Sequence, residues 1–229
     1  MSDLRTDQPS IAIVGGHGHI ALALTRLLSG GGSRVLGIVR NPGQAQDIES
    51  AGGVPVHLDI EEATAEQLGD AVAGVDAIVF SAGAGPGSGP ARKLTVDLGG
   101  SVLAQRAAAL VGVRRFLQVS AMVDRDPGPD ADESWRAYVH AKREADADLR
   151  ATSLDWTILR PGRLSFEAPT GLVRIGEPLE PGATSEPVPR GDVAAVLAAL
   201  VTDRRSVRRT LDVVGGGAPI GRELDRVLG

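Results

Sequence analysis

A short apolar run followed at once by closely spaced glycines constrains this chain more than any other feature. The run Ile11-Ala12-Ile13-Val14 predicts a buried strand, and Gly15-Gly16-His17-Gly18 follows it directly. The next segment, residues 20–28, carries leucines at helical spacing and ends at three consecutive glycines. A glycine-rich turn between a first strand and a first helix is typical of an open α/β sheet that holds a phosphate group at that turn.

Strands and helices alternate along the rest of the chain. Apolar runs predict strands at residues 11–14, 34–39, 54–58, 75–80, 115–120, 154–159 and 210–214, with a weak strand at 172–175. Helical spacing predicts helices at residues 20–28, 44–51, 64–73, 91–111, 135–151, 192–201 and 219–228. We therefore expect the α/β class: one doubly wound Rossmann domain with a mainly parallel sheet of about seven strands and helices on both faces.

The length of the chain bounds the number of domains. Its 229 residues suit one α/β domain, whereas a closed barrel of eight βα units usually needs more. Residues 1–9 are expected to form a flexible N-terminal tail, and residues 10–229 the dinucleotide-binding domain. The Pro- and Gly-rich segment at about 161–190 is expected to form a small substrate-side region of that domain.

Composition and charge exclude several classes of protein. The chain has no cysteine, which excludes disulfides, thiolate metal sites and thiol catalysis. A net charge of −5 gives no basic footprint for nucleic acid, and the arginines at 204–209 are interpreted as a solvated helix end and strand start. No signal peptide and no membrane-spanning run is found. We expect a cytoplasmic monomer or dimer with a small-molecule substrate and no nucleic-acid or membrane partner.

The glycine-rich turn fits two known spacings for binding a dinucleotide. Gly16-x-Gly18-x-x-Ala21 matches the dinucleotide fingerprint, and Gly15-x-x-Gly18-x-x-Ala21 matches the spacing of short-chain reductases. In both, glycine permits a tight turn and lets backbone amides approach the diphosphate at a positive helix end. Two histidines without a third ligand predict no metal site. The candidate cofactor-binding residues here are Gly15, Gly16, His17, Gly18, His19 and Ile20.

The residue at the end of the second strand indicates which dinucleotide is bound. NAD-binding folds usually carry an acidic residue near this place, which accepts hydrogen bonds from the ribose 2′-hydroxyl. This chain has Arg40 instead, within Val39-Arg40-Asn41-Pro42. A guanidinium suits the 2′-phosphate of NADP, so the sequence favours NADP (NADPH) over NAD. The alternative for Arg40 is a solvent-facing arginine at a strand end.

Several further segments resemble a known superfamily. They are Val39-Arg40-Asn41, Leu58-Asp59-Ile60, Ser81-Ala82-Gly83, residues 115–120, 156–162 and 189–194. With them the chain resembles the atypical short-chain dehydrogenases/reductases, in their small NAD(P)-binding branch of NmrA-like and biliverdin/flavin-reductase-like proteins. The resemblance implies that Asp59 and Ile60 flank the adenine, that Ser81, Ala82 and Gly83 run under the cofactor ribose, and that Pro161 and Gly162 lie beside the nicotinamide.

A tyrosine and a lysine four residues apart indicate proton-transfer chemistry. Tyr138 and Lys142 share one face of their predicted helix and match the Tyr-x-x-x-Lys pair of catalytic short-chain reductases. A lysine ammonium favours tyrosinate, and the tyrosine then protonates a carbonyl oxygen as hydride arrives. Ser120, at the end of the fifth predicted strand, is the candidate that holds this oxygen. We therefore predict an NADP-dependent oxidoreductase that reduces a small carbonyl, a quinone or a similar acceptor.

Several alternatives stay open at this point. Many extended members carry the catalytic serine or threonine one or two residues after Ser120, where this chain has Ala121 and Met122. The alternative functions are therefore a non-catalytic NADP(H)-binding redox sensor and an NAD(P)-dependent epimerase or dehydratase. Tyr138 and Lys142 could instead be a half-buried tyrosine and a surface lysine.

Two acidic residues could have structural rather than functional roles. For Asp59 the alternative role is a helix N-cap. Asp97 and Lys93, one helical turn apart, are expected to form a surface ion pair.

Overall fold

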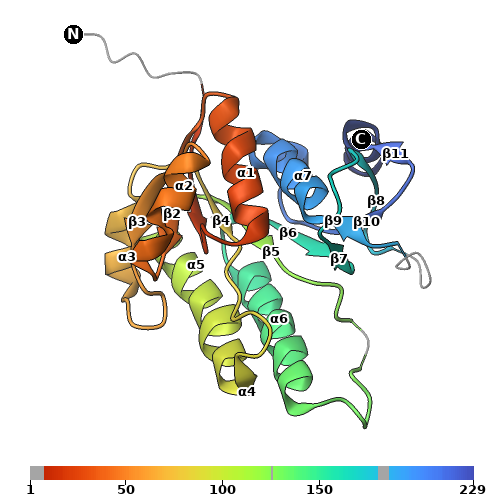
Figure 1. The fold of residues 1–229 in the computed structure, drawn as a ribbon, viewed down its shortest axis with the longest axis horizontal. Coiled ribbons are helices and arrows are strands. Elements are labelled where there is room, and N and C mark those ends of the chain that lie inside the picture. Colours follow the sequence, from red (N-terminus) through yellow and green to blue (C-terminus); the bar gives the residue numbers. More distant parts are fainter. Residues whose placement is uncertain (1–7, 125, 180–185) are drawn as a thin grey trace.

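One large sheet runs through the middle of the protein (Figure 1). The computed structural model describes residues 8–124, 126–179 and 186–229, so most of the expected tail lies outside the described residues. The sheet has nine strands, with Ser10–Val14 as β1, Arg34–Val39 as β2, Val54–His57 as β3, Ala77–Phe80 as β4, Arg115–Val119 as β5, Asp155–Pro161 as β6, Leu172–Gly176 as β8, Arg209–Gly215 as β10 and Ala218–Pro219 as β11. Leu164–Ser165 (β7) and Val188–Pro189 (β9) pair separately.

The strand order of this sheet defines a doubly wound fold. It runs β11-β8-β10-β6-β5-β4-β1-β2-β3, and the seven strands from β10 to β3 are parallel. The chain builds outward from β1 to β3, then returns to the other side of β1 as β4. This confirms the expected α/β class and mainly parallel sheet. It also places a crevice at the carboxyl ends of β1 and β4, where the strand order reverses.

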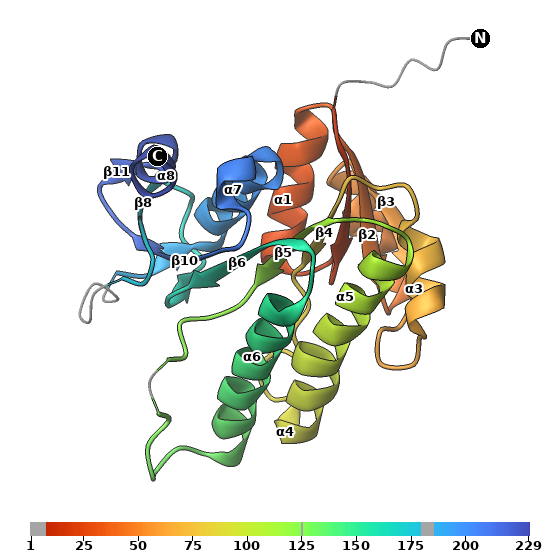
Figure 2. The same cartoon turned by 180° about the vertical axis from the view of Figure 1, so that it is seen from behind.

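Helices cover both faces of the sheet (Figures 1 and 2). One layer contains α1 (His19–Gly30), α2 (Ala45–Ser50) and α7 (Arg190–Thr202); the other contains α3 (Ala65–Val72), α5 (Gly100–Leu110) and α6 (Glu133–Ala151). The helix α8 (Ile220–Leu228) packs on β8. Short helical pieces are Pro42–Gln44, Gly89–Arg92 (α4), Lys93–Gly99 and Arg204–Ser206.

Alternating side chains of each central strand supply two separate apolar cores. In β1, Ile11 and Ile13 pack with α1 and α7, whereas Ala12 and Val14 pack with the α3 and α5 layer. All four side chains are fully buried. A parallel strand covered on both faces must be apolar on both faces, which is why this run reads as uninterrupted hydrophobic sequence.

The expected helix at 91–111 is present, but its middle is wider than an α-helix. Residues Lys93–Gly99 form a π-helical segment between α4 and α5. Gly100 begins α5, and a β-carbon there would lie 2.7 Å from the Ile60 side chain, so this glycine allows a close approach to the loop after β3. Such π segments often occur at functional sites.

The expected surface ion pair between Lys93 and Asp97 is wrong. Both residues are buried, at 8% and 2% exposure. The Lys93 ammonium donates to the backbone oxygen of Gly85 (2.6 Å), and Asp97 pairs with Lys142 (Nζ–Oδ1 3.3 Å). The π segment turns Asp97 into the protein, a change that i, i+4 reasoning on a regular α-helix does not predict.

A buried arginine joins the sheet to the end of α7. Arg115 opens β5 and is only 5% exposed. Its guanidinium donates to the backbone oxygens of Leu200, Val201 and Asp155, and to the hydroxyls of Thr157 and Ser206. Burial lowers its pKa to about 10, so the group is still charged at neutral pH.

Among the helices of the described residues, none combines the length and the apolar character that a membrane-spanning segment needs.

Replacing Arg115 with leucine tests this junction. Because several buried acceptors would lose their donor, we expect Arg115→Leu to lower the free energy of unfolding by about 3 kcal/mol or more. Urea denaturation followed by circular dichroism measures this change. The matched control is Arg106→Leu, at an exposed position of α5, which should leave the midpoint nearly unchanged. Equal midpoints for the two variants would contradict the assignment.

Candidate functional site

The turn after β1 is shaped by close contacts that only glycine allows. Gly15 has φ +84°, and a β-carbon on it would lie 2.6 Å from the backbone of Ala82. A β-carbon on Gly16 would lie 2.6 Å from the Cα of Gly37 in β2. The amides of Gly15 and Gly16 both donate to the backbone oxygen of Ile38. The first turn of α1 therefore begins tightly against the two strands that flank β1.

The start of α1 has no side-chain cap. Gly18 occupies the N-cap position and supplies no side chain to the free amides of the first turn. Unlike Gly15 and Gly16, it has an ordinary φ of −58°, and a β-carbon there would make only van der Waals contacts. Gly18 is exposed on the side that faces the cavity described next. This arrangement leaves the positive end of α1 available to an anionic ligand.

A cavity of about 400 Å³ lies at the carboxyl ends of β1, β2, β3 and β4. Ten of the expected cofactor-binding residues line it: Gly15, His17, Gly18, His19, Arg40, Asp59, Ile60, Ser81, Ala82 and Gly83. Its other walls are Ile38, Val39, Gln44, Leu58, Glu61, Arg92 and Val96. The volume lies within the range usual for small-molecule sites. The crevice predicted from strand order is thus a real hollow, lined by the predicted segments.

Four of the expected cofactor-binding residues do not line this cavity. Gly16 and Ile20 are buried behind the turn, against Gly37 and the α1 core. Pro161 ends β6, and the amide of Gly162 donates to Val213 in β10. Their roles beside the diphosphate and the nicotinamide stay predictions.

The two histidines of the turn have different partners. The ring of His17 lies 2.7 Å from a carboxylate oxygen of Asp47 in α2. The ring of His19 lies edge-on to Phe166, with 5.1 Å between ring centroids. Within the described part of the chain, no cluster of three or more ligating side chains could hold a metal ion.

A carboxylate paired with two arginines lies at the rim of the cavity. Glu61 accepts from Arg92 (Nη2–Oε2 2.6 Å), from Arg40 (Nη1–Oε2 3.2 Å) and from the Thr95 hydroxyl (2.6 Å). The Arg92 hydrogen bond is the main reason that the pKa of Glu61 is lowered. Sequence reasoning identified Arg40 but missed Glu61 and Arg92. Glu61 could have been predicted as a site residue, because it lies only two residues after the candidate Asp59.

Asp59 does not cap a helix. Its carboxylate accepts from the amide of Glu61 (3.0 Å) in a local turn. The N-cap of α3 is Thr64, which exchanges hydrogen bonds with Gln67 in a capping box. The N-cap alternative for Asp59 is therefore wrong, and the side chain is left at the cavity wall.

Tyr138 and Lys142 share one face of α6, as their spacing predicts, with Tyr138 half-buried and Lys142 buried. The Lys142 ammonium lies 5.8 Å from the centroid of the Tyr138 ring and is 6% exposed, so it is not a surface lysine. It donates to the backbone oxygen of Val119 and pairs with Asp97. Burial raises the pKa of Tyr138, and the Lys142 charge opposes that rise only in part. Tyr138 is therefore a protonated phenol at neutral pH.

Asp97 links this pair to the cavity. One carboxylate oxygen faces Lys142, and the other accepts from the amide of Ala84 (2.9 Å). Ala84 directly follows Ser81-Ala82-Gly83, which lines the cavity. The structure thus brings the predicted proton-transfer pair next to the predicted ribose segment through a residue that sequence reasoning had assigned to the surface.

Ser120 is part of a buried hydrogen-bond network. Its hydroxyl donates to Asp146 (2.9 Å), whose other oxygen accepts from Gln118 (2.7 Å). Burial raises the pKa of Asp146, against the effect of these two hydrogen bonds. Sequence reasoning missed Asp146, although it stands one turn after Lys142 on the same helix.

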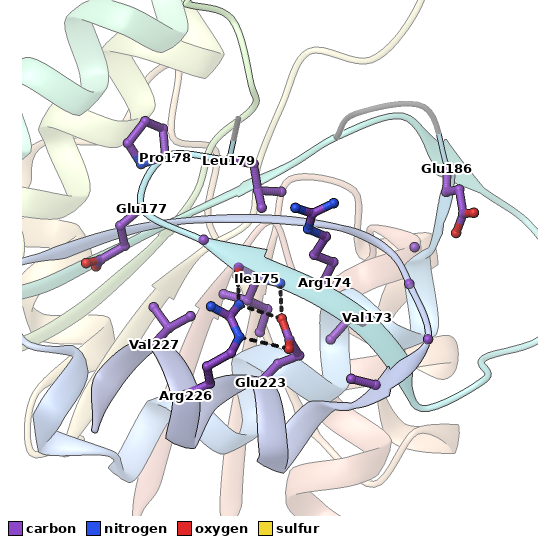
Figure 3. A pocket seen from close by; sticks show the side chains of 15 residues that line it. Val173, Arg174, Ile175, Glu177, Pro178, Leu179, Glu186, Glu223, Arg226 and Val227 are labelled. Atoms are coloured by element: carbon purple, nitrogen blue, oxygen red, sulfur yellow. Dashed lines mark hydrogen bonds and ion pairs between the residues drawn. The ribbon is translucent and has the colours of Figure 1, made fainter. Parts of the chain in front are cut away.

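A larger hollow of about 870 Å³ lies at the far edge of the sheet, between β8 and α8 (Figure 3). Glu223 and Arg226 form its floor. Glu223 accepts from Arg226 (2.7 Å) and from the Ile175 amide (2.8 Å), and Arg226 also donates to the Ile175 oxygen. Glu223 and Arg226 are therefore paired with each other, and the charged side chains of Arg174, Glu177 and Glu186 also line this hollow.

The fold and the cavity together define a nicotinamide-dinucleotide-binding protein of the Rossmann type. The sequence profile of a family described as NAD(P)H-binding matches residues 15–204. The chain belongs to this NAD(P)H-binding family, among the atypical short-chain dehydrogenases/reductases, which confirms the resemblance stated from its motifs.

Similar proteins occur in distant organisms. The UPF0659 protein YMR090W of Saccharomyces cerevisiae is 37% identical over 217 residues, which cover 92% of this chain and 95% of that protein. The uncharacterized sugar epimerase YhfK of Bacillus subtilis is 34% identical and covers 95% and 99%. A solved structure from Bacillus halodurans, described as a candidate NAD-dependent epimerase/dehydratase, has a TM-score of 0.87 at 34% identity and covers 96% and 100%.

Adding one methyl group to the turn tests whether a dinucleotide approaches Gly18. The fold tolerates a β-carbon there, so Gly18→Ala should cost about 1 kcal/mol of stability or less. The methyl group would occupy the exposed side of the turn, so we expect NADPH and NADH to bind about tenfold more weakly or worse. Calorimetric titration measures both affinities.

The matched control for this prediction is Gly30→Ala, where a β-carbon meets nothing within 4 Å. It should keep the wild-type affinities. Unchanged dinucleotide binding by Gly18→Ala would show that no ligand contacts this part of the turn.

Proposed function

We propose that this protein is an NADPH-dependent reductase of a small carbonyl compound, a quinone or a similar acceptor. The observation that carries the proposal is the shared Tyr138–Lys142 face of α6, which Asp97 connects to the wall of the dinucleotide cavity. When bound, the nicotinamide supplies the hydride. The protein's own groups then bind the coenzyme, hold the acceptor and deliver a proton to its oxygen.

The arginines at the rim support NADP as the coenzyme. Arg40 is 55% exposed and can turn toward a ligand, and Arg92 lies on the other side of Glu61. A 2′-phosphate would compete with the Glu61 carboxylate for these two guanidiniums. Glu61 therefore lowers the benefit of the arginines for NADP, and the balance between the three residues sets the selectivity.

Tyr138 is the proposed proton donor. Its hydroxyl is protonated at neutral pH because burial raises its pKa, as reduction of a carbonyl requires. Asp97 pairs with Lys142 and offsets part of its charge, which limits how far Lys142 stabilises tyrosinate. The step at this residue is the transfer of the phenol proton to the acceptor's oxygen, which becomes a hydroxyl.

Ser120 is the proposed second contact to that oxygen. Its hydrogen points to Asp146 when Asp146 is ionised. Gln118 donates to the other carboxylate oxygen, so a proton on Asp146 would lie on the oxygen that faces Ser120. Because the pKa of Asp146 is raised, protonation is easier here than for an ordinary carboxyl group, and it would release the Ser120 hydrogen toward the acceptor.

An epimerase or dehydratase is the second candidate. The names of the Bacillus relatives favour it, and a Tyr–Lys pair suits reversible hydride chemistry as well as reduction. Against it, the described residues between β6 and α7 form only the short strands β7, β8 and β9. A reductase consumes NADPH stoichiometrically with its acceptor, whereas an epimerase regenerates its coenzyme. Absorbance of NADPH during turnover on carbonyl, quinone and sugar-nucleotide panels separates the two, and no turnover on any panel would favour a sensor.

Selectivity for NADPH should respond in opposite directions to two rim substitutions. Arg40→Ala removes a guanidinium and should lower the NADPH/NADH affinity ratio about tenfold. Glu61→Gln removes the competing carboxylate and should raise that ratio. Calorimetric titration of both coenzymes measures it, with Arg34→Ala, exposed at the start of β2, as the control. The NADP assignment fails if the ratio for Arg40→Ala equals that of the wild type.

Removing the tyrosine hydroxyl should impair chemistry and spare coenzyme binding. Tyr138→Phe is expected to lower kcat about 100-fold or more, with NADPH affinity unchanged. The wild-type kcat for reduction should be constant from about pH 7 to 9, because the phenol stays protonated there, and should fall only above about pH 10. His140→Ala, exposed on the same helix, is the control. Full turnover by Tyr138→Phe would remove Tyr138 from the mechanism.

A further inference from the structure

Three side chains from distant parts of the sequence form a small cluster at the edge of the dinucleotide cavity. Arg190 is the first residue of α7, and its guanidinium carbon lies 3.8 Å from the centroid of the Phe166 ring. The same ring receives His19, the first residue of α1 and part of the cavity wall. The helices α1 and α7 pack side by side (Figure 1), which brings the three residues together.

Arg190 is half-buried, and one of its guanidinium nitrogens lacks the partner that an enclosed donor needs. Its Nη1 atom is enclosed but has no hydrogen-bond acceptor, and no hydrogen bond or ion pair of this side chain occurs among the described residues. The carboxylate nearest in sequence, Asp192, is occupied by Thr170 and Gly171. By contrast, Arg115 and Arg160 have acceptors around them. An enclosed N–H group without an acceptor is costly and calls for an explanation such as a missing ligand.

The position of Arg190 adds to this cost. A positive charge at the first residue of a helix faces the positive end of the helix dipole, which is unfavourable without an anion nearby. Phe166 is 76% exposed, so this large ring gains little from burial where it lies. It does hold the guanidinium plane by a cation–π contact, which orders the arginine before any ligand arrives. The cluster therefore has the features of a prepared site: an ordered, charged donor whose enclosed Nη1 atom has no acceptor among the described residues.

We propose that Arg190 binds an oxyanion, a phosphate or carboxylate group, at the His19 edge of the dinucleotide cavity. A planar guanidinium stacked on Phe166 can present two parallel N–H groups to such an anion. The anion can come from the diphosphate of the coenzyme or from an acidic substrate held beside it. In the second case this proposal deepens the proposed function, because it limits the acceptor to compounds that carry a carboxylate or a phosphate.

The test uses Arg190→Gln, Arg190→Lys and Phe166→Leu, with Arg222→Met, at an exposed position of α8, as the control. Phe166 is exposed, so its substitution leaves the fold intact even if Arg190→Gln does not. Thermal denaturation first establishes which variants are folded. Calorimetry then measures NADPH affinity, and NADPH fluorescence follows titration of inorganic phosphate and of oxalate into the NADPH-loaded protein.

Each source of the anion gives its own result. If the anion is the coenzyme diphosphate, Arg190→Gln weakens NADPH about tenfold or more, and Phe166→Leu weakens it less. If the anion belongs to the substrate, NADPH affinity stays within about twofold, whereas saturable binding of phosphate or oxalate is lost in Arg190→Gln and partly kept in Arg190→Lys. Either result supports the site, provided that Arg222→Met behaves as the wild type.

The proposal is overturned if neither NADPH nor the two anions change affinity by more than about twofold in folded variants at Arg190 and Phe166. Failure of the proposed function is a separate result. If the wild type binds no pyridine dinucleotide, phosphate and oxalate are titrated into the ligand-free protein and followed by calorimetry. Saturable binding that requires Arg190 then still supports the oxyanion site, and equal binding by wild type and Arg190→Gln overturns it.

Discussion

The site depends on how closely the backbone after β1 approaches its two neighbours. Gly16 faces Gly37 of β2, and Gly15 faces Ala82 after β4, at distances where a β-carbon would collide with backbone atoms. These contacts set where α1 begins and aim its uncapped first turn into the crevice between β1 and β4. The cavity, its walls and the position of His19 all follow from this approach. A fold with bulkier residues here would still form a sheet, but its first helix would begin farther from the strands.

Buried charge organises the other half of the site. The helix α6 carries Lys142 and Asp146 on one face, and each has a partner on a different element. Asp97 reaches Lys142 because the π segment widens the helix that carries it. These pairs fix the backbone after β4 and β5 relative to α6, which gives a polar, ordered wall next to Tyr138. Such an arrangement suits proton transfer, since positions and protonation states are established before a substrate binds.

The same cavity and the same Tyr138–Lys142 face could serve either a reductase or an epimerase. Reduction and epimerisation both need a bound nicotinamide, a nearby acid or base and an ordered substrate. They differ in what holds the substrate, and the described residues between β6 and α7 contribute the strands β7, β8 and β9. Arg190 is of special interest, because one strong, directed interaction can select among substrates. Elsewhere on the cavity wall, the ion pairs of Glu61 with Arg40 and Arg92 also place a few charged groups where they can select a ligand.

Local sequence determined the elements and the turn of this protein. Apolar runs and glycine spacing are short-range signals, so they predicted the α/β class, the parallel sheet and ten of the residues that line the cavity. The Tyr138–Lys142 face was also predictable, because i, i+4 geometry is local.

Tertiary structure alone decided the electrostatics. The sequence predicted that Asp97 lies on the surface, whereas the π segment and α6 bury it in the structure. Glu61 acquires its role from Arg92, 31 residues away, and Arg190 meets Phe166 and His19 only when α7 packs on α1. Burial and pairing between distant residues set the charge state of each group, and no pattern along the chain encodes them directly.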